Sequence, residues 1–570
     1  MKLNKSKLAA AVMVAAAGSA HAVSVSESGS GQVLIYPYYN TNNGFVTNVQ
    51  IVNTQNVAKI VKFRMRESGN SQDVIDFNIY MSPYDVWKGV IRSVDRDGQK
   101  RANIISADTT CTLPLNNKPI TINGVGGLTL KDTGWDMNVV YPDVSDDDAR
   151  EGYIEVIEIG NIDPDYYADT DGDGIIDKTK DANIVASITH ESGVPKDCTV
   201  IEKAWTNGAG LDGNTALVSN WGGNFGVPAV DAPSGGLYGF LVLLNTAQGS
   251  AFIAEATAID SYSTRSQHFL SDDVNNFLLP SLASGDVSTT MVAVPSADGA
   301  EILTGWPLTV DAALNDGDPN TPYSGPNPLP IAHVLQTTNV VNSYFVDPDF
   351  QGATEWVLTF PMKKHGIFNG QFANGEWTFD STSGEYTCAT PTGAAVVETW
   401  TDVNTLPSPD SDDASDHVCF KGHKQDVQVS VIMFDQEESV LEDTDFGVSP
   451  PIAIPSRTLS REVNIITFSD SGSSILGASV VENVNPGNDF KAGWASVTFD
   501  AKYCLTNGQL SDGTAGNFIL AAAPAASCGV PTIGFAALQG ADFNIQEGTF
   551  FGESVEHRFA RSVTVTTGSP

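Results

Sequence analysis

The stretch Val61-Lys62-Phe63-Arg64-Met65-Arg66 alternates apolar and basic side chains at every position. Successive side chains of a β-strand point to opposite faces of its sheet, so this spacing predicts a strand with its apolar residues on one face and its basic residues on the other. The stretch Val427–Met433 repeats the pattern, with four apolar side chains at alternate positions. A period of two therefore decides the fold class of both regions.

Similar runs recur along the chain, separated by turns rich in Gly, Asn, Asp and Pro. They are Gln32–Tyr39, Val74–Met81, Gly152–Ile159, Tyr238–Asn245, Ala251–Ile259, Glu355–Phe360, Arg461–Phe468, Gly493–Phe499 and Arg558–Thr566. Such runs favour antiparallel β-sandwiches. We therefore expect an all-β fold of antiparallel β-sandwich domains, with long acidic loops and at most one or two short helices. The helical candidate is Ser271–Leu282, which Ser271 would cap and Pro280 would limit.

The composition bounds the possible functions. Of 570 residues, 30 are Lys or Arg and 68 are Asp or Glu, so the formal net charge is −38. This charge argues against nucleic-acid binding, which needs a basic surface, and against docking on anionic lipid. Hydrophobic residues make up 41% of the chain, enough to build a sizeable core and to exclude global disorder.

Residues 1–22 have the features of a secretory signal peptide. Three Lys in the first seven residues precede the short apolar run Leu8–Ala17, and Ala20-His21-Ala22 is a small-x-small cleavage site. A stable membrane span needs about 20 apolar residues, and no run in the chain reaches that length. We expect cleavage after Ala22, export to the cell surface or medium, and no transmembrane segment. Cleavage removes three Lys and no acid, which makes the net charge −41.

The domain boundaries are weakly marked. The acidic stretches Asp143–Arg150 and Pro407–Asp416 are typical of exposed loops, and Asp311–Pro330 is rich in Asn, Asp, Gly and Pro. We divide the mature chain near residue 300, into an N-terminal β-sandwich region at 23–300 and a C-terminal one at 301–570. The alternative is that the two parts share sheets.

Six cysteines remain in the mature chain, and an even number in an exported protein favours disulfides. Six cysteines allow 15 connectivities, and pairing of neighbours in the sequence is the expectation adopted. The expected pairs are Cys111–Cys198, Cys388–Cys419 and Cys504–Cys528. A metal cluster of Cys419 with His417 and His423 is a weaker alternative, because the chain has no Cys-x-x-Cys spacing.

One motif has specific chemical content. The stretch Asp169-Thr170-Asp171-Gly172-Asp173-Gly174-Ile175-Ile176-Asp177 has the D-x-D-x-D-G spacing of a calcium loop. We expect Asp169, Asp171 and Asp173 to supply carboxylates and Gly174 to permit the sharp turn. Ile175 would supply its backbone carbonyl. The alternative is an ordinary acidic turn.

Further residues of the loop are expected to complete the ligands of Ca²⁺. Asp177 would bind the ion directly or through water. The pattern is similar to the loops of EF-hands, dockerins and thrombospondin type 3 repeats, but those have an acid at loop position 12, where this chain has Lys180. Asp181, or Asp163 and Asp165 nearby, are the candidate replacements.

The sequence contains little that resembles a catalytic motif, so we do not expect an enzyme. His190-Glu191 lacks the second His of a zinc protease motif, and neither a Gly-x-Ser-x-Gly elbow nor a Gly-rich phosphate loop is present. A secreted hydrolase with two distant carboxylates remains an alternative. The aromatic stretches Tyr36–Tyr39 and Tyr80–Trp87 are interpreted as core or subunit-interface residues, with sugar stacking as the alternative.

Several stretches resemble a family of exported surface proteins. They are Val33–Tyr39, Val49–Thr54, Asp76–Trp87, Val341–Pro348, Thr354–Pro361, Arg461–Phe468, Ile533–Ala537 and Glu556–Arg558. With its size and acidity, the chain is most similar to the surface-layer (S-layer) proteins of marine Gram-negative bacteria. The resemblance implies a protein that tiles the outer cell surface as a two-dimensional lattice and contributes to biofilm matrix. It carries over no catalytic residue.

Three hypotheses follow from these observations. The first is a self-assembling, calcium-dependent surface protein whose partners are further copies of itself and, at the outer membrane, lipopolysaccharide or another surface glycan. The second is a secreted adhesin or glycan-binding β-sandwich protein. The third is a secreted hydrolase.

Overall fold

The alternating stretch at 61–66 forms the middle of strand β4 (Lys59–Glu67) in a computed structural model of the chain. The structure describes residues 23–122, 124–137, 147–173, 176–207, 221–222, 224–227, 229–271, 279–287, 292–295, 301–304, 329–363, 376–380, 385–389, 399–400, 427–437, 440–442, 457–469, 472, 474–487, 490–499, 504–505, 527–541 and 550–561. The fold is all-β, as predicted, with antiparallel pairing throughout the four large sheets except between two strands.

Two large sheets come from the N-terminal part of the chain. The first has the order β1 (Ser24–Val25), β21 (Thr257–Asp260), β2 (Val33–Asn40), β12 (Glu151–Ile162), β4, β5 (Asp73–Met81) and β8 (Cys111–Leu113), with β18 (Val230–Asp231) beside β12. The second has the order β11 (Trp135–Asp136), β7 (Gln99–Ile105), β6 (Val86–Arg96), β3 (Val46–Asn53), β19 (Leu237–Asn245) and β20 (Ser250–Glu255). Their apolar faces pack together as a sandwich.

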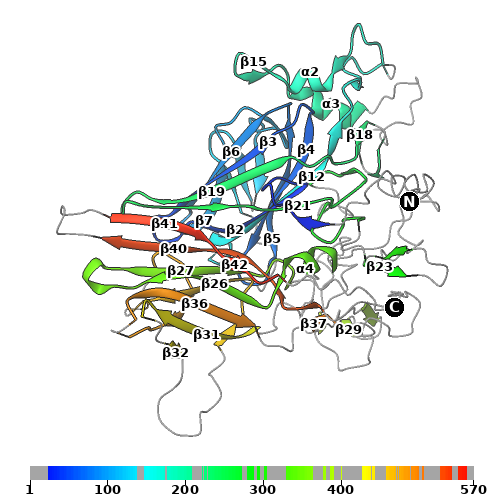
Figure 1. The fold of residues 1–570 in the computed structure, drawn as a ribbon. Helices are drawn as coiled ribbons and strands as arrows, with labels where there is room; N and C mark the ends of the chain where they lie inside the picture. The colour runs from blue at the N-terminus through cyan, green and yellow to red at the C-terminus, as the bar shows by residue number, and fades with distance from the viewer. Residues whose placement is uncertain are drawn as a thin grey trace, which may run out of the picture.

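Two further large sheets come from the C-terminal part. One has the order β32 (Val440–Glu442), β31 (Val427–Asp435), β36 (Ala492–Phe499), β26 (Asn339–Phe345) and β42 (Arg558–Phe559), with β33 (Arg457–Leu459) beside β31. The other has the order β35 (Glu482–Val484), β34 (Val463–Phe468), β27 (Ala353–Thr359), β40 (Ile533–Ala541) and β41 (Phe550–Glu556), where β34 and β35 are parallel. Figure 1 shows this second sandwich below the first, and β41 lies against β20.

The remaining strands are short and lie outside the large sheets. They pair as β9 (Ile120–Ile122) with β10 (Val125–Leu128), β13 (Tyr167–Ala168) with β14 (Ala182–Asn183), β15 (His190–Glu191) with β16 (Val194–Pro195), β17 (Asn224–Phe225) with β22 (Gln267–His268), β23 (Val292–Pro295) with β24 (Glu301–Thr304), β25 (Gln336–Thr337) with β39 (Val530–Pro531), β28 (Glu376–Asp380) with β29 (Glu385–Ala389) and β30 (Thr399–Trp400), and β37 (Cys504–Leu505) with β38 (Ser527–Cys528).

Three short α-helices occur among the described residues, one more than the upper number expected: α2 (Ile184–Ile188), α3 (Thr199–Asn207) and α4 (Leu329–Leu335). None is long and apolar enough to cross a membrane. The helix predicted at Ser271–Leu282 falls largely on residues 272–278, outside the described part, and its described ends are not helical.

The predicted single strand Ala251–Ile259 is wrong in one respect. The chain forms β20 up to Glu255 and β21 from Thr257, and these two strands belong to different sheets of the N-terminal sandwich. Ala256 makes the crossing and donates its backbone N–H to the Gly239 carbonyl at 3.0 Å. A strand that changes sheets keeps its alternation, so the sequence pattern does not mark the crossing.

The basic face of β4 is buried, in addition to its apolar face. Lys62 pairs with Asp76 at 2.8 Å, and Arg64 pairs with Asp73 at 3.0 Å. Arg64 also donates to the carbonyl of Pro280, in a segment that covers this face of the sheet. Full burial of charges is tolerated because each has an opposite charge nearby. The alternation therefore predicted the strand, while the cover over its basic face comes from far along the chain.

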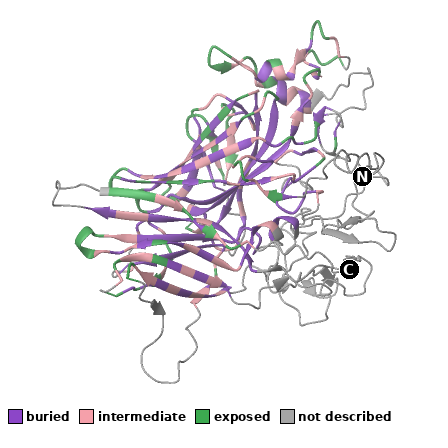
Figure 2. Ribbon diagram, viewed as in Figure 1, coloured by how far each residue is buried: buried purple, intermediate pink, exposed green. Residues whose placement is uncertain are grey.

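The two sandwiches share one continuous apolar core. Each large sheet takes its strands from one side of residue 300, but Ile331, Val357 and Ile533 from the C-terminal part belong to the same buried cluster as Val33 and Tyr38. Figure 2 shows buried residues running through the strands of both sandwiches. A separate cluster fills the interior of the C-terminal sandwich. The division near residue 300 thus separates the large sheets but not the core.

The segment Ser474–Ser479 connects the two sandwiches through polar contacts. Leu476 donates its N–H to Glu355 of β27 at 2.8 Å, and its carbonyl accepts from Asn40 of β2 at 2.6 Å. Ser479 contacts Glu151 of β12 through both its hydroxyl and its N–H. One short segment is thereby hydrogen-bonded to strands of both sandwiches.

The aromatic stretches have mixed positions. Tyr36, Tyr38, Tyr80 and Trp87 are completely buried, as expected for core residues, whereas Tyr84 is 64% exposed. The rings of Phe77 and Trp87 pack edge-on inside the N-terminal sandwich. Most of these residues therefore stabilise the core and are not available for sugar stacking.

Of the three expected disulfides, Cys111–Cys198 is confirmed, with a Cα–Cα distance of 5.4 Å. It joins β8 to the residue before α3. Cys504 and Cys528 face each other as Cα partners in the pair of β37 and β38, and their bridge stays a prediction. Cys419, and with it the pair Cys388–Cys419 and the alternative cluster with His417 and His423, lies outside the described residues.

Glu355 makes the stability of the folded chain depend on pH. Burial raises the pKa of Glu355 from 4.5 to about 7, and its hydrogen bonds from Leu476 and Ser474 only partly counteract this. Between pH 4.5 and 7, Glu355 is therefore protonated in the folded state and ionised in the unfolded state. The contribution of Glu355 to the free energy of unfolding is at its maximum, about 3 kcal/mol, below pH 4.5. It is lost as the pH rises through 7.

We predict that Glu355→Gln flattens this part of the stability profile, because the amide keeps an acceptor oxygen and does not ionise. Denaturant midpoints measured from pH 5 to pH 8 should fall less for Glu355→Gln than for the unchanged chain. Glu191→Gln, at an exposed position, is the matched control and should keep the original slope. Equal slopes for all three proteins would contradict this account.

Candidate functional site

The predicted calcium loop forms the tip of a hairpin between β13 and β14. Carboxylate oxygens of Asp169, Asp171 and Asp173 all lie within 4.8 Å of one another. Asp169 is buried, whereas Asp171 and Asp173 are exposed. The structure therefore brings together three of the predicted ligands at one point of the surface.

Local hydrogen bonds explain why the loop curls around these three carboxylates. Asp169 accepts the Gly172 N–H at 2.6 Å, and Asp171 accepts the Asp173 N–H at 3.2 Å. Gly172 has a positive φ of 78°, a conformation that glycine adopts without a steric penalty. Asp side chains favour such turns because they bond to the backbone two or three residues on.

Asp181 closes the base of the loop. Its two carboxylate oxygens accept the N–H groups of Thr170 at 2.8 Å and Asp177 at 2.7 Å, which ties the start of the loop to its end. Asp163 accepts the N–H of Asp165 in the preceding turn, and neither joins the group of three. Asp181 thus ties the loop together and lies outside the group of three, and its replacement of the missing acid at position 12 stays a prediction.

Asp177 does not join the group of three. Its carboxylate accepts both the hydroxyl of Thr179, at 2.6 Å, and the N–H of Thr179, at 2.9 Å, and it faces Lys180 at 3.4 Å. The hydrogen bonds from Thr179, with the charge of Lys180, hold the pKa of Asp177 below its usual value. The predicted ligand Ile175 and the turn residue Gly174 lie outside the described residues.

The donor set of this loop suits a hard cation. All three side chains offer oxygen, and Ca²⁺ takes six to eight oxygen ligands from carboxylates, carbonyls and water. The two exposed carboxylates leave room for water on the solvent side. Asp169, Asp171 and Asp173 are therefore the residues that would hold such an ion.

A small core of its own supports the hairpin. Tyr166 and Ala168 before the loop, and Ile184 and Ile188 after it, belong to a buried cluster beneath α2 and α3. Asn183 caps α2 by accepting the Ala186 N–H at 2.8 Å. The loop therefore begins and ends on fixed positions.

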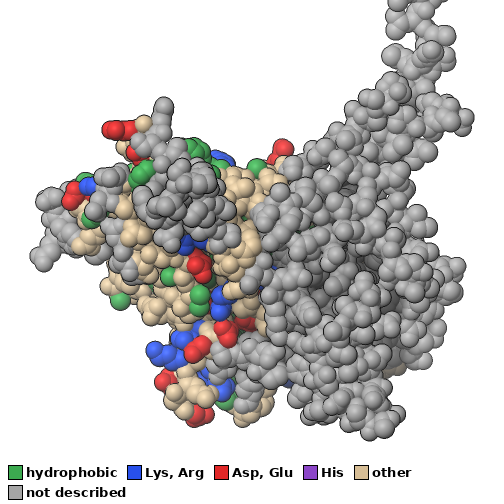
Figure 3. Space-filling view, turned by 90° about the horizontal axis from the view of Figure 1, so that it is seen from below, with side chains coloured by type: hydrophobic (Ala, Val, Ile, Leu, Met, Phe, Trp, Pro, Cys, Tyr) green, Lys and Arg blue, Asp and Glu red, His purple; other side chains and the backbone are tan. Residues whose placement is uncertain are grey.

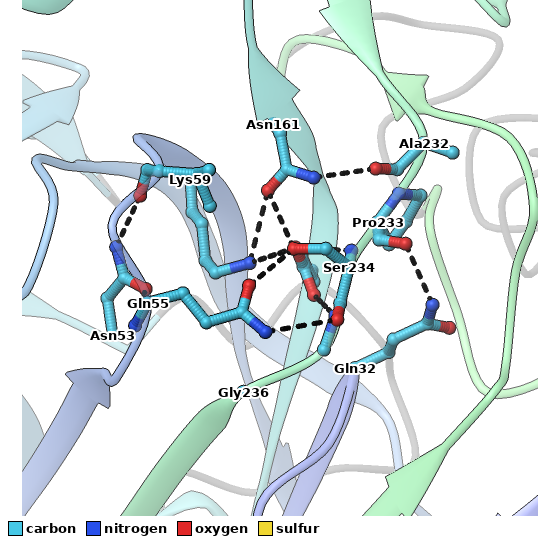
Figure 4. Close-up of polar contacts among 12 residues, drawn as sticks. Gln32, Asn53, Gln55, Lys59, Asn161, Ala232, Pro233, Ser234 and Gly236 are labelled. Atoms are coloured by element: carbon cyan, nitrogen blue, oxygen red, sulfur yellow. Dashed lines mark hydrogen bonds and ion pairs between the residues drawn. The ribbon is translucent and has the colours of Figure 1, made fainter.

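A second polar cluster, which the sequence did not reveal, surrounds Lys59 (Figure 4). The ammonium group of Lys59 lies 2.6 Å from Glu158, and both side chains are fully buried. Lys59 also donates to Ser234 at 2.7 Å and to Asn161 at 3.1 Å, and Ser234 donates to Gln55 at 2.6 Å. The only sequence signal is a Lys at the start of an apolar alternating run.

The Lys59 cluster fastens the turn before β19 to the first sheet. Burial lowers the pKa of Lys59 and raises the pKa of Glu158, and the attraction between the two charges counteracts both shifts. Glu158 also accepts the backbone N–H groups of Ser234 and Gly235 at 3.0 and 2.8 Å. A Ser beside a Lys could suggest a nucleophile and its base, but here the ammonium group is paired with a carboxylate and cannot take a proton.

His190 forms a third cluster, with Asp85 and Thr109. Its Nδ1 lies 3.8 Å from the Asp85 carboxylate, longer than a hydrogen bond, and its Nε2 lies 3.3 Å from the Thr109 hydroxyl. That hydroxyl also lies 3.1 Å from the Gly193 carbonyl, to which it donates. Nδ1 also lies 3.4 Å from the Ser82 hydroxyl, so the arrangement links β15 and β16 to the neighbouring turns.

Two other histidines are buried within aromatic surroundings. Burial lowers the pKa of His268 and of His557 to about 3, so both rings are neutral at physiological pH. His268 lies between Trp205 and Trp221. His365 and the side chain of His333 lie outside the described residues.

Comparison with known proteins gives no relative: no family model, no curated protein and no solved structure matches this chain.

We predict that Lys59→Met destabilises the fold by about 3–5 kcal/mol, because it leaves the Glu158 carboxylate buried without its counter-charge. Adding Glu158→Gln should recover part of this loss, since the amide carries no charge and its single oxygen can still accept one of the two backbone N–H groups. Denaturant midpoints would measure both effects, with the exposed Lys88→Met as the control. The account is contradicted if the double variant is less stable than Lys59→Met alone.

Proposed function

We propose that this chain is an exported structural protein whose copies assemble into a two-dimensional layer on the outer cell surface and contribute to biofilm matrix. The observation that carries the proposal is the continuous core shared by two β-sandwiches, because a layer needs subunits that keep one shape. A flexible subunit would lose more entropy at each contact. The resemblance of the sequence to surface-layer proteins of marine bacteria points the same way.

Export is supported by the first 22 residues and by the disulfide. A basic start, a short apolar run and Ala20-His21-Ala22 fit a cleaved signal peptide. The Cys111–Cys198 bridge fits an oxidising compartment outside the cytoplasm. Both observations agree with a location at the cell surface.

We further propose that Ca²⁺ binds at Asp169, Asp171 and Asp173 and fixes the loop between β13 and β14. Three carboxylates within 4.8 Å repel one another, and a divalent cation removes that repulsion. The net charge of −41 that remains after cleavage makes exported copies repel one another in low salt, whereas salt near seawater strength shortens the screening length to a few ångströms. Assembly should therefore require both salt and calcium.

A secreted glycan-binding protein is the second candidate. The observation in its favour is the exposed indole of Trp494 on the outer face of β36, since flat aromatic rings on a surface are suited to stacking on sugars. Lipopolysaccharide or another surface glycan is the ligand this function would require. Binding of purified glycans to the exported chain would support it.

We predict that residues 23–570 form ordered sheets in Ca²⁺ at seawater-like ionic strength, visible by electron microscopy. A chelator should disperse the sheets, and restored Ca²⁺ should rebuild them. Monomers dispersed under calcium-replete conditions would contradict the layer.

The calcium loop itself is tested by calorimetry. Asp171→Asn should abolish one Ca²⁺ site or weaken it by about tenfold or more, because it removes a charged oxygen ligand. Asp132→Asn makes the same charge change at an exposed position outside the loop and should leave the titration unchanged. Identical titrations for the two variants would show that the loop binds no Ca²⁺.

A further inference from the structure

Three side chains of the first sheet bring an amine, a carboxylate and an amide into contact (Figure 4). The side-chain nitrogen of Lys59 lies 2.6 Å from Glu158 and 3.1 Å from Oδ1 of Asn161. An amine can displace the nitrogen of a side-chain amide when a neighbouring group carries the protons, and the product is a new amide bond. This reaction releases ammonia and needs no oxidant or other reactant.

The strands hold these three groups in place. Lys59 and Asn161 are Cα partners in the antiparallel pair of β4 and β12, where opposite Cβ atoms lie about 5 Å apart. Glu158 is three residues before Asn161, a spacing that puts two side chains on opposite faces of a regular strand. The register shifts between Glu158 and Gly160, and this irregularity brings both side chains to Lys59. A side chain at Gly160 would meet the carbonyl oxygen of Asp231, so glycine is required at the shift.

The amide of Asn161 is turned so that its oxygen faces Lys59. Its nitrogen donates to the carbonyl of Ala232 at 2.8 Å, a group that can only accept. The acyl carbon is one covalent bond beyond the oxygen that Lys59 contacts. The hydroxyl of Ser234 lies 3.2 Å from the same oxygen. By turning its proton from Gln55 to this oxygen, Ser234 would stabilise the negative charge that develops when an amine adds to the carbon.

Burial separates Lys59 from the basic side chains at the surface. Seen from below, Lys and Arg side chains of the described surface lie beside Asp and Glu in contact with solvent (Figure 3), and water keeps such groups charged. Lys59 and Glu158 are fully buried. Burial lowers the pKa of Lys59 and raises the pKa of Glu158. Both shifts favour passage of a proton from the amine to the carboxylate, against the attraction of the two charges, and the neutral amine is the nucleophile.

We propose that Lys59 and Asn161 are joined by an intramolecular amide bond, which the folded chain forms by itself with Glu158 as the proton carrier. The proposal goes beyond the proposed function, because it depends neither on a layer nor on calcium.

The step balances in atoms and charge. One proton passes from Nζ of Lys59 to Glu158, and the freed electron pair of Nζ forms a bond to Cγ of Asn161 while the carbonyl electrons move to Oδ1. Glu158 gives this proton to Nδ2. The carbonyl then re-forms, the Cγ–Nδ2 bond breaks, and Nδ2 leaves as ammonia with the electrons of that bond. Nζ passes a second proton to Glu158, which ends neutral, as a buried carboxyl without a counter-charge prefers.

Ammonia can leave and the product is durable. Asn161 is only partly buried and Ser234 is exposed, so the reacting amide lies near solvent. The bond closes a loop between residues 102 apart in sequence and restricts the unfolded chain, as a disulfide does. Cys111 lies within this loop and Cys198 outside it, so the two covalent loops overlap. Unlike the disulfide, the amide resists reduction, which suits an exported protein.

Mass spectrometry of the unchanged chain, purified after export and then reduced, is the first test. The intact mass should be lower than the mass of the sequence by one ammonia. Trypsin does not cleave after an acylated Lys, so residues 23–62 should appear joined to residues 151–178. Neither peptide contains a cysteine, so the link cannot be a disulfide.

Variants assign the bond to its three groups. Asn161→Ala removes the acyl carbon and should keep the full mass. Glu158→Gln removes the proton carrier and should slow bond formation about a hundredfold or more. Asn161→Asp loses water instead of ammonia, so it should reach the same final mass as the unchanged chain. Asn485→Ala, at an exposed position, is the control and should be fully linked. Circular dichroism checks that each variant is folded.

Three results would overturn the proposal. The first is a full intact mass for the unchanged chain, with the two tryptic peptides separate, which does not depend on any variant. The second is loss of one ammonia in Asn161→Ala, which would place the reaction elsewhere. The third is complete linkage of Glu158→Gln at the rate of the unchanged chain, which would remove Glu158 from the reaction.

Discussion

The peptide group of Leu476 is the point on which the arrangement of the two sandwiches depends. Its N–H is bound by Glu355 in the C-terminal sandwich, and its carbonyl is bound by Asn40 in the N-terminal one. These two bonds fix the segment where β2 and β27 approach, and the apolar residues around them close into one core. Buried backbone groups must be hydrogen-bonded, so an alternative packing of the two sandwiches would leave this peptide unsatisfied.

The proposed calcium site is tied to this shared body through the first sheet. The loop with Asp169 is at the tip of a hairpin, over a small core that the Cys111–Cys198 bridge ties to the first sheet. A cation at the loop would therefore act on a hairpin that is fixed to the first sheet.

Sequence patterns predicted what is local. Alternation located β4 and β31, and D-x-D-x-D-G spacing located three carboxylates that do meet. The patterns did not reveal contacts between residues far apart in sequence: the cover over Arg64 comes from Pro280, and the partner of Lys59 is Glu158. Spacing also did not reveal that the Asp177 carboxylate accepts the Thr179 hydroxyl and faces Lys180. Contacts between residues far apart in sequence require long loops to close, and tertiary packing offsets the entropy lost in closing them. A short stretch of sequence does not show that packing.

The central claim is that copies of this chain tile a cell surface. Electron cryotomography of intact cells that produce the chain tests it most directly, with cells lacking the chain as the control. The account predicts a regular two-dimensional lattice outside the outer membrane, present only when the chain is produced. A surface without periodic order, in cells shown to export the chain in quantity, would contradict it.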